Sequence, residues 1–153
     1  MSHDDTGREL AAGHEAGHAV VAWHYGAYID KVTVIPFTLA DGTQAGGCVK
    51  AAAFRSRRAE AACTLAGHAA NITLQGIDAA TAWEAAQGDV RDLRAAGVPD
   101  DTWPVHMGFA CGILEKRRRQ WERLYTRLLT VDELPWREVA TILGRRDPYG
   151  QPG

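Results

Sequence analysis

One stretch, residues 6–25, constrains the fold more than any other because it combines the pattern of a long helix with a group of polar side chains. Thr6 and Glu9 form a capping-box pair that predicts the helix start, and Gly26 predicts its end. Alanine and valine occur on every side of this segment, which indicates a helix buried nearly all round. The sequence therefore predicts a buried helix near the front of the chain.

The motif HEAGH lies within this helix and contains His14, Glu15 and His18. Side chains four residues apart lie one above the other on a helix, so both imidazoles can bind one zinc ion at roughly 2.0–2.1 Å. Glu15 lies about 100° further round the axis, beside the metal, where it can take a proton from a water. The competing interpretation is a buried helix whose polar side chains each find a hydrogen-bond partner. We favour zinc, because three polar residues cluster on an otherwise apolar helix.

The rest of the chain predicts further helices and one small sheet. Ser56, and then Asp78 or Thr81, can cap helices, and Thr130 with Glu133 forms a second capping box. Strands are predicted at 31–36 and 44–51 around a turn at 39–43, and helices at 57–76, up to 86, at 89–97, 104–129 and 135–143. The expected class is mainly α with a small β-hairpin or sheet (α+β). We expect a single domain over residues 1–153, with its core at about 6–143 and a flexible tail at 144–153.

Composition narrows the function classes. The net charge of -2 gives no global electrostatic case for nucleic acid or a membrane surface. No apolar run approaches the roughly 20 residues that span a bilayer, and the first residues lack the pattern of a signal peptide. Three cysteines at unpatterned spacing (Cys48, Cys63 and Cys111) fit free thiols in a cytoplasmic protein. The basic run 116–119 predicts a solvated helix face rather than a nucleic-acid site, because glutamates lie at pairing distance.

Four segments resemble the protease domain of the FtsH family, the membrane-bound AAA+ zinc metalloproteases. They are HEAGHAVV followed by KVTVIP, then CTLAGHAANITLQG, GDVRDLRAA and, more loosely, LLTVDELPWREVATIL. The resemblance covers about residues 10–97 with fair specificity. It implies a mostly helical zinc peptidase fold in which His14, His18 and Asp89 bind Zn²⁺ and Glu15 is catalytic.

The third metal ligand has several candidates. Asp89 stands where the family's ligand aspartate stands, although after a glycine it also suits a helix N-cap. His24 has the spacing of the metzincin signature HExxHxxGxxH, but Val21 replaces the glycine that would let the chain leave the helix. A continuing helix would point His24 away from His18. The weaker candidates are Glu84 and Asp92, and the lone histidines His68 and His106 more often serve structural roles.

The sequence thus predicts a cytoplasmic zinc metalloendopeptidase whose partner is a flexible or unfolded polypeptide substrate. No GxxxxGK[ST] P-loop occurs, so we expect ATP-independent action as a stand-alone chain without the family's membrane segment. The strand at 44–51 can accept an extended substrate by strand addition, with Gly46, Gly47 and Cys48 in contact with it. The alternatives are a catalytically idle relic that binds peptides or partners, and a regulatory peptidase with one dedicated substrate. A homo-oligomer or an unidentified partner protein stays open.

Overall fold

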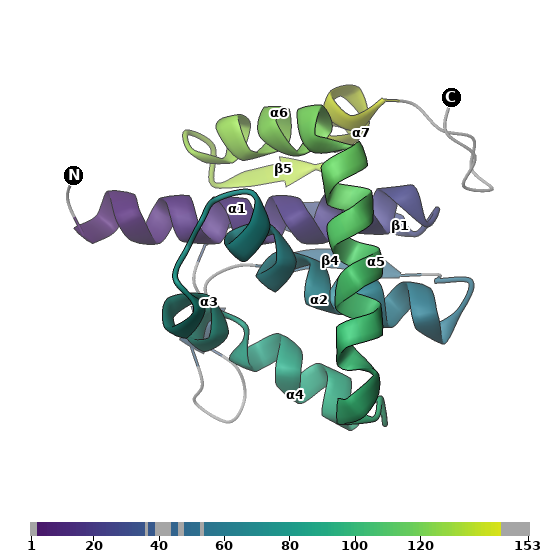
Figure 1. Ribbon diagram of the computed structural model, residues 1–153. Coiled ribbons are helices and arrows are strands. Elements are labelled where there is room, and N and C mark those ends of the chain that lie inside the picture. The colour runs from purple at the N-terminus through teal and green to yellow at the C-terminus, as the bar shows by residue number, and fades with distance from the viewer. Residues whose placement is uncertain (1–2, 36, 39–43, 46–47, 53, 145–153) are drawn as a thin grey trace.

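The computed structural model describes residues 3–35, 37–38, 44–45, 48–52 and 54–144 (Figure 1). Its elements in chain order are α1 (His3–His24), β1 (Tyr28–Thr33), β2 (Phe37–Thr38), β3 (Gln44–Ala45), β4 (Cys48–Ala52), α2 (Arg57–Thr73), α3 (Ala79–Ala85), α4 (Gln87–Ala95), a 3₁₀ turn (Asp100–Thr102), α5 (Trp103–Lys116), α6 (Arg118–Leu128), β5 (Glu133–Pro135) and α7 (Trp136–Leu143). The predicted class is confirmed at this level: most described residues are helical, and the strands form small antiparallel sheets.

The central element is α1, which crosses the molecule and contacts α2, α5, α6 and the sheet (Figure 1). Every residue from Ala12 to Trp23 is buried, as the sequence predicted for this helix. Small residues allow a close approach to α2: a Cβ atom on Gly17 would lie 2.5 Å from the carbonyl oxygen of Ala66 and 2.8 Å from the Cβ of Ala70. Since atoms cannot approach so closely, glycine at this position sets the distance between the two helices.

The larger sheet has the strand order β4-β1-β5, and both pairings are antiparallel. Val32 in the central strand lies opposite Val49 on one side and Leu134 on the other. The predicted second strand is present as two shorter pieces, β3 and β4, of which β3 pairs with β2. The predicted turn at 39–43 lies outside the described residues.

Both predicted capping boxes are wrong. Thr6 lies inside α1, which begins at His3. Glu133 begins β5 rather than a helix turn, because its backbone pairs with Thr33 of β1. The caps predicted at Ser56 and Asp78 are confirmed, whereas the alternative cap, Thr81, lies inside α3. Ser56 accepts a hydrogen bond from the Ala59 amide at 3.1 Å, and Asp78 accepts one from the Thr81 amide at 3.0 Å.

The predicted helix 104–129 is divided at Arg117, so that α5 and α6 run in different directions (Figure 1). The Arg117 guanidinium lies 4.6 Å from the centre of the Trp23 ring, and its Nε donates to the Nδ1 of His24 at 2.9 Å. These contacts with the end of α1 hold Arg117 in a non-helical conformation, with ψ at 28°. Beyond this corner Trp121 is buried and donates to the Gly13 carbonyl at 3.1 Å. Trp121, which follows the basic run 116–119, therefore faces the core.

Across the described residues, none of the helices combines the length and the hydropathy that a membrane-spanning segment requires. The last nine residues, 145–153, which hold most of the predicted tail, lie outside the described part of the chain.

Candidate metal centre

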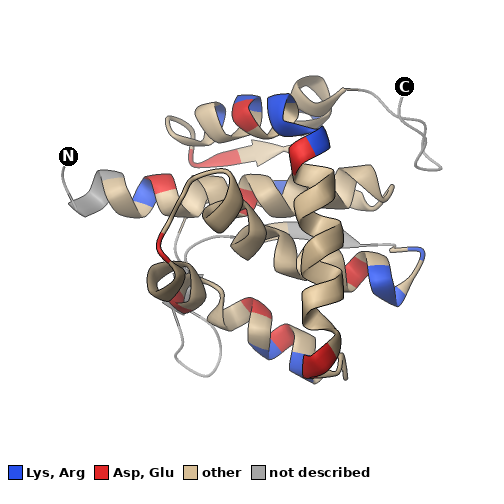
Figure 2. Cartoon of the chain, viewed as in Figure 1, with Lys and Arg blue, Asp and Glu red and all other residues tan. Residues whose placement is uncertain are grey.

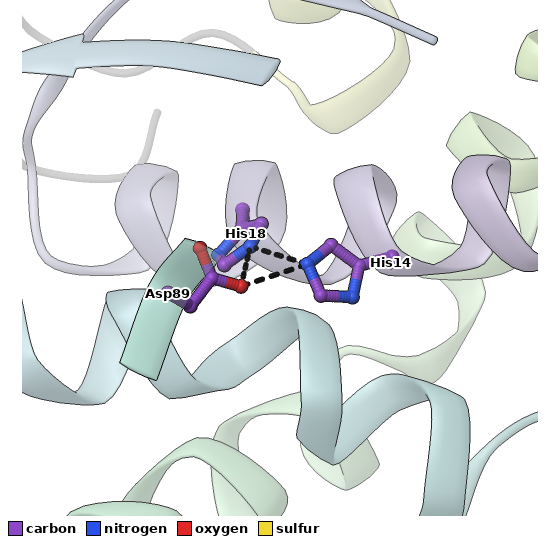
Figure 3. Close-up of side chains that lie close together, drawn as sticks. All are labelled: His14, His18 and Asp89. Carbon is purple, nitrogen blue, oxygen red and sulfur yellow. Dashed lines mark hydrogen bonds and ion pairs between the residues drawn. The ribbon is translucent and has the colours of Figure 1, made fainter. Parts of the chain in front are cut away.

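Three side chains from two helices, α1 and α4, converge on one point (Figure 3). His14 and His18 project from the same side of α1, and Asp89 projects from α4 toward them. The Oδ2 atom of Asp89 lies 2.8 Å from the Nε2 of His14 and 3.1 Å from the Nε2 of His18. The two Nε2 atoms lie 3.0 Å apart. The residues that the sequence proposed as metal ligands are therefore brought together.

Asp89 owes its direction to its position in α4. It is the third residue of that helix, and the N-cap residue, Ala86, makes no side-chain cap hydrogen bond. The alternative interpretation of Asp89 as the N-cap is therefore wrong. Burial alone would raise the pKa of Asp89, but the charges and hydrogen bonds of His18 and His14 outweigh it and hold the pKa well below its usual range.

The far side of the His18 ring meets a backbone carbonyl. Its Nδ1 lies 2.6 Å from the carbonyl oxygen of Cys63 on α2, an atom that can only accept a hydrogen bond. Nδ1 therefore carries a proton, and in the neutral ring Nε2 is left with a lone pair directed at Asp89. Burial would lower the pKa of His18, but the Asp89 carboxylate outweighs burial and raises the pKa well above its ordinary value.

A chain of amides fixes the orientation of His14. The Nδ2 of Asn71 donates to the Leu10 carbonyl at 3.2 Å and to the Oε1 of Gln75 at 2.6 Å. Gln75 in turn donates through Nε2 to the Glu9 carbonyl at 2.8 Å. The Leu10 and Glu9 carbonyls can only accept hydrogen bonds, so the NH₂ groups of Asn71 and Gln75 must point toward them. The Oδ1 of Asn71 is therefore the atom that faces His14 Nδ1, at 3.0 Å. His14 must donate through Nδ1, and its Nε2 also presents a lone pair to the centre.

Three hydrogen-bond acceptors, each with a lone pair, therefore point at one another across about 3 Å: two imidazole nitrogens and a carboxylate oxygen. Such a group is repulsive unless a cation lies among the three atoms, either a proton or a metal ion. Ligand atoms at roughly 2.0–2.1 Å from a tetrahedral zinc ion are separated by about 3.3 Å, close to the spacing observed. The nitrogen and oxygen donor set also suits zinc. The residues present therefore fit a zinc ion.

Glu15 lies beside this centre, near enough for the charges on His18 and Asp89 to act on its carboxylate. The residue is only 5% exposed, and its Oε2 has no hydrogen-bond partner among the described residues. Burial raises the pKa of Glu15 above its ordinary value, although the neighbouring histidines oppose that effect. A buried carboxylate oxygen without a partner is costly and is best explained by a water or ligand group that binds there.

Gly67 on α2 forms the wall of the site next to His14. A Cβ atom at this position would lie 2.5 Å from the Nε2 of His14 and 2.6 Å from two of its ring carbons. The glycine therefore leaves room for the imidazole to reach the centre. Asn71 lies one helical turn further along the same face and holds the opposite edge of the ring.

The other candidates lie elsewhere. His24 accepts a hydrogen bond from Arg117, and it is absent from the group of potential metal ligands in the described residues. Asp92 and Glu84 are exposed. The Nδ1 of His68 lies 3.2 Å from the Ala82 carbonyl on α3, and His106 is half-buried on α5.

The proposed substrate contacts are described only in part. Gly46 and Gly47 lie outside the described residues. Cys48 begins β4, the strand at one end of the three-stranded sheet, but its side chain is likewise outside the description. Asn71, Gln75 and Gly67 were not predicted as residues of the site. The signal was present: two amides four residues apart interrupt an alanine-rich helix, and helical spacing aligns them with Gly67.

Neither a scan against models of known protein families nor a search of curated proteins finds a match to this chain.

Proposed function

We propose that the chain is a zinc-dependent metallopeptidase that hydrolyses peptide bonds in flexible or unfolded polypeptides without ATP. In this proposal His14, His18 and Asp89 hold Zn²⁺, and Glu15 is the general base. The proposed fold is that of the FtsH protease domain, as the resemblance in sequence implies.

One observation supports the proposal above the others. Three lone pairs from His14, His18 and Asp89 converge on one point, and next to them Glu15 keeps a buried oxygen without a partner in the described residues. A helix whose histidines only needed hydrogen-bond partners would not need Glu15, a fourth ionisable group, beside them. A hydrolytic centre needs both a metal-binding group and a base.

The residues have separate roles in this proposal. Bound zinc would polarise the scissile carbonyl and lower the pKa of an attacking water. Glu15 would accept the proton of that water as the water oxygen forms the C–O bond with the scissile carbonyl, and would then deliver the proton to the amine nitrogen, so that the peptide C–N bond can break. Its raised pKa makes it a better base than an ordinary exposed glutamate. Asn71 and the Cys63 carbonyl would keep the two imidazoles in the tautomer that binds metal.

The substrate class follows from the edge of the sheet. Within the order β4-β1-β5, β4 pairs with β1 on one side. An extended polypeptide can add to such an edge through backbone hydrogen bonds, which tolerate many sequences. A segment that is already paired inside a folded substrate has its backbone donors and acceptors occupied and cannot add to the edge in this way. The proposed substrates are therefore flexible segments.

Metal analysis and one substitution test the proposal. The purified chain should contain zinc at one equivalent and should cleave an unfolded protein such as casein. Glu15→Gln should keep the zinc but reduce cleavage by about 10²-fold or more. Glu84→Gln, an exposed glutamate on α3, is the matched control and should leave cleavage unchanged. Absence of stoichiometric zinc, or equal cleavage by Glu15→Gln and the parent, would contradict the proposal.

A further inference from the structure

The outward face of α5 is largely apolar, and the Arg58 guanidinium of α2 lies 5.2 Å from the centre of the Phe109 ring on this face. Val105 is 57% exposed and Phe109 is 40% exposed, and the two residues lie one turn apart. Between its ends α5 carries no Lys, Arg, Asp or Glu, as the uncoloured middle of this helix in Figure 2 makes visible. An exposed helix normally carries charged residues on its outer face, so this pattern needs an explanation.

Two glycines lie on the same face. Gly108 and Gly112 are exposed, and a Cβ atom on either would meet nothing within 4 Å. Neither has a positive φ, so alanine would fit the backbone at both positions. Glycine destabilises an exposed helix interior relative to alanine, and no contact within the described chain compensates. Glycines four residues apart do allow a second helix to approach the backbone closely.

The charges at the two ends of this face have opposite signs. Asp101, in the 3₁₀ turn one turn before Val105, and Lys116, one turn after Gly112, are both exposed and follow the same helical stripe. The midpoint between Asp101 and Lys116 falls between Gly108 and Phe109, at the centre of the apolar stripe. A second α5 helix packed antiparallel about a two-fold axis at that centre would bring each Asp101 next to the partner's Lys116.

We propose that the chain forms a symmetric homodimer through the α5 face, defined as Asp101, Val105, Gly108, Phe109, Gly112 and Lys116. The interface is isologous, so one patch supplies both halves and both ion pairs. The self-complementary charge pattern identifies a second copy of this chain as the occupant, because an unrelated partner would not require opposite charges at equal distances from the centre. This proposal is independent of the metal centre.

Sedimentation equilibrium of the full chain tests it. One helix pair buries less than a standard interface, so we expect a dissociation constant on the order of 10 µM. Gly112→Leu should weaken the dimer about tenfold or more, because the side chain keeps the helices apart. Leucine is a good helix former, and a thermal melt will verify that this variant is folded.

Charge reversal provides the sharper test. Asp101→Lys and Lys116→Glu should each weaken the dimer by about fivefold to tenfold, since like charges then meet across the axis. The double variant recreates both pairs with reversed polarity and should restore the dissociation constant to within about threefold of the parent. Arg137→Glu, an exposed change on α7 with the same loss of positive charge as Lys116→Glu, should have no effect. A chain that stays monomeric up to about 1 mM, or a double variant no better than the single ones, overturns the proposal.

Discussion

The Nδ1 atom of His14 lies 3.0 Å from the Oδ1 atom of Asn71, a residue with no exposed surface. This contact joins α1 to α2 at the metal centre and decides which nitrogen of the imidazole faces Asp89. Because Asn71 donates both of its amide protons elsewhere, it can only accept from His14. The orientation of a proposed zinc ligand is thus set by a residue fifty-seven positions away in the sequence.

Replacement of Asn71 tests this dependence. Asn71→Ala should weaken zinc binding by about 10- to 100-fold, because the His14 ring loses the acceptor that fixes its tautomer and rotation. Zinc affinity can be measured by competition with a chromophoric chelator. Thr73→Ala is the control on the same helix, since Thr73 is an exposed residue whose hydroxyl donates to the Ala69 carbonyl and makes no contact with His14 in the described contacts. Equal zinc affinities in the two variants would show that Asn71 does not position His14.

Replacement of Gly67 gives a second, steric test of how α2 packs against the His14 ring. Gly67→Ala would place a methyl group 2.5 Å from the His14 Nε2, so either the imidazole or α2 must move. We expect loss of zinc binding and a decrease of about 1–3 kcal/mol in the free energy of unfolding. Gly108→Ala, at an open helical position, should instead raise the free energy of unfolding by about 0.5–1 kcal/mol. Urea unfolding of dilute samples compares the two, and an unchanged zinc affinity in Gly67→Ala would contradict the close packing at His14.

Much of the metal centre could be predicted from the sequence because its pattern is local. The spacing of His14 and His18 places both rings on one face of any helix, and the alanine- and valine-rich segment that ends at Gly26 predicts the helix itself. The position of Asp89 came from a resemblance to a known family, since no rule of spacing joins residues that are seventy-one positions apart. The supporting residues on α2 were not predicted, because a buried amide network depends on the distance between two packed helices.

The errors in the fold have tertiary causes. The segment from Pro104 to Leu129 has no helix-breaking residue at Arg117, and local propensity therefore predicted a single helix. The chain turns there because Arg117 contacts Trp23 and His24, which a local pattern does not contain. Glu133 matched a capping box, but pairing with β1 made it part of a strand. In both cases long-range contacts outweighed a local preference worth about 1 kcal/mol.

The contact between Arg117 and His24 predicts a dependence of stability on pH. Burial first, and then the positive charges of Arg117 and Lys116, lower the pKa of His24 below its ordinary value. The unfolded chain therefore binds this proton more readily than the folded chain. The stabilising contribution is complete above about pH 6.5 and is lost as the pH falls through the lowered pKa of the folded state.

His24→Gln removes that titration, because a glutamine oxygen can accept from the Arg117 Nε at any pH. Urea unfolding near pH 7.5 and near pH 5.5 gives the loss of stability for the parent and the variant, and comparing the two losses cancels the other titrating groups. We expect the variant to lose less stability than the parent on acidification. An equal loss in both proteins would show that His24 does not carry this pH dependence.

Zinc itself should stabilise the folded chain, and this effect identifies the third ligand. A metal that binds only the folded state adds about 2.7 kcal/mol to the free energy of unfolding at a free concentration 100-fold above its dissociation constant. A chelator should remove this increment. Asp89→Ala should abolish it, because two imidazoles alone are an incomplete site for zinc. Asp92→Ala, an exposed change one turn further along α4, should keep the zinc stabilisation. His24→Ala should keep it too, since the His24 ring accepts a hydrogen bond from Arg117 and does not face the metal centre. Zinc stabilisation that survives in Asp89→Ala but disappears in His24→Ala would assign the third ligand to His24 and overturn the proposed centre.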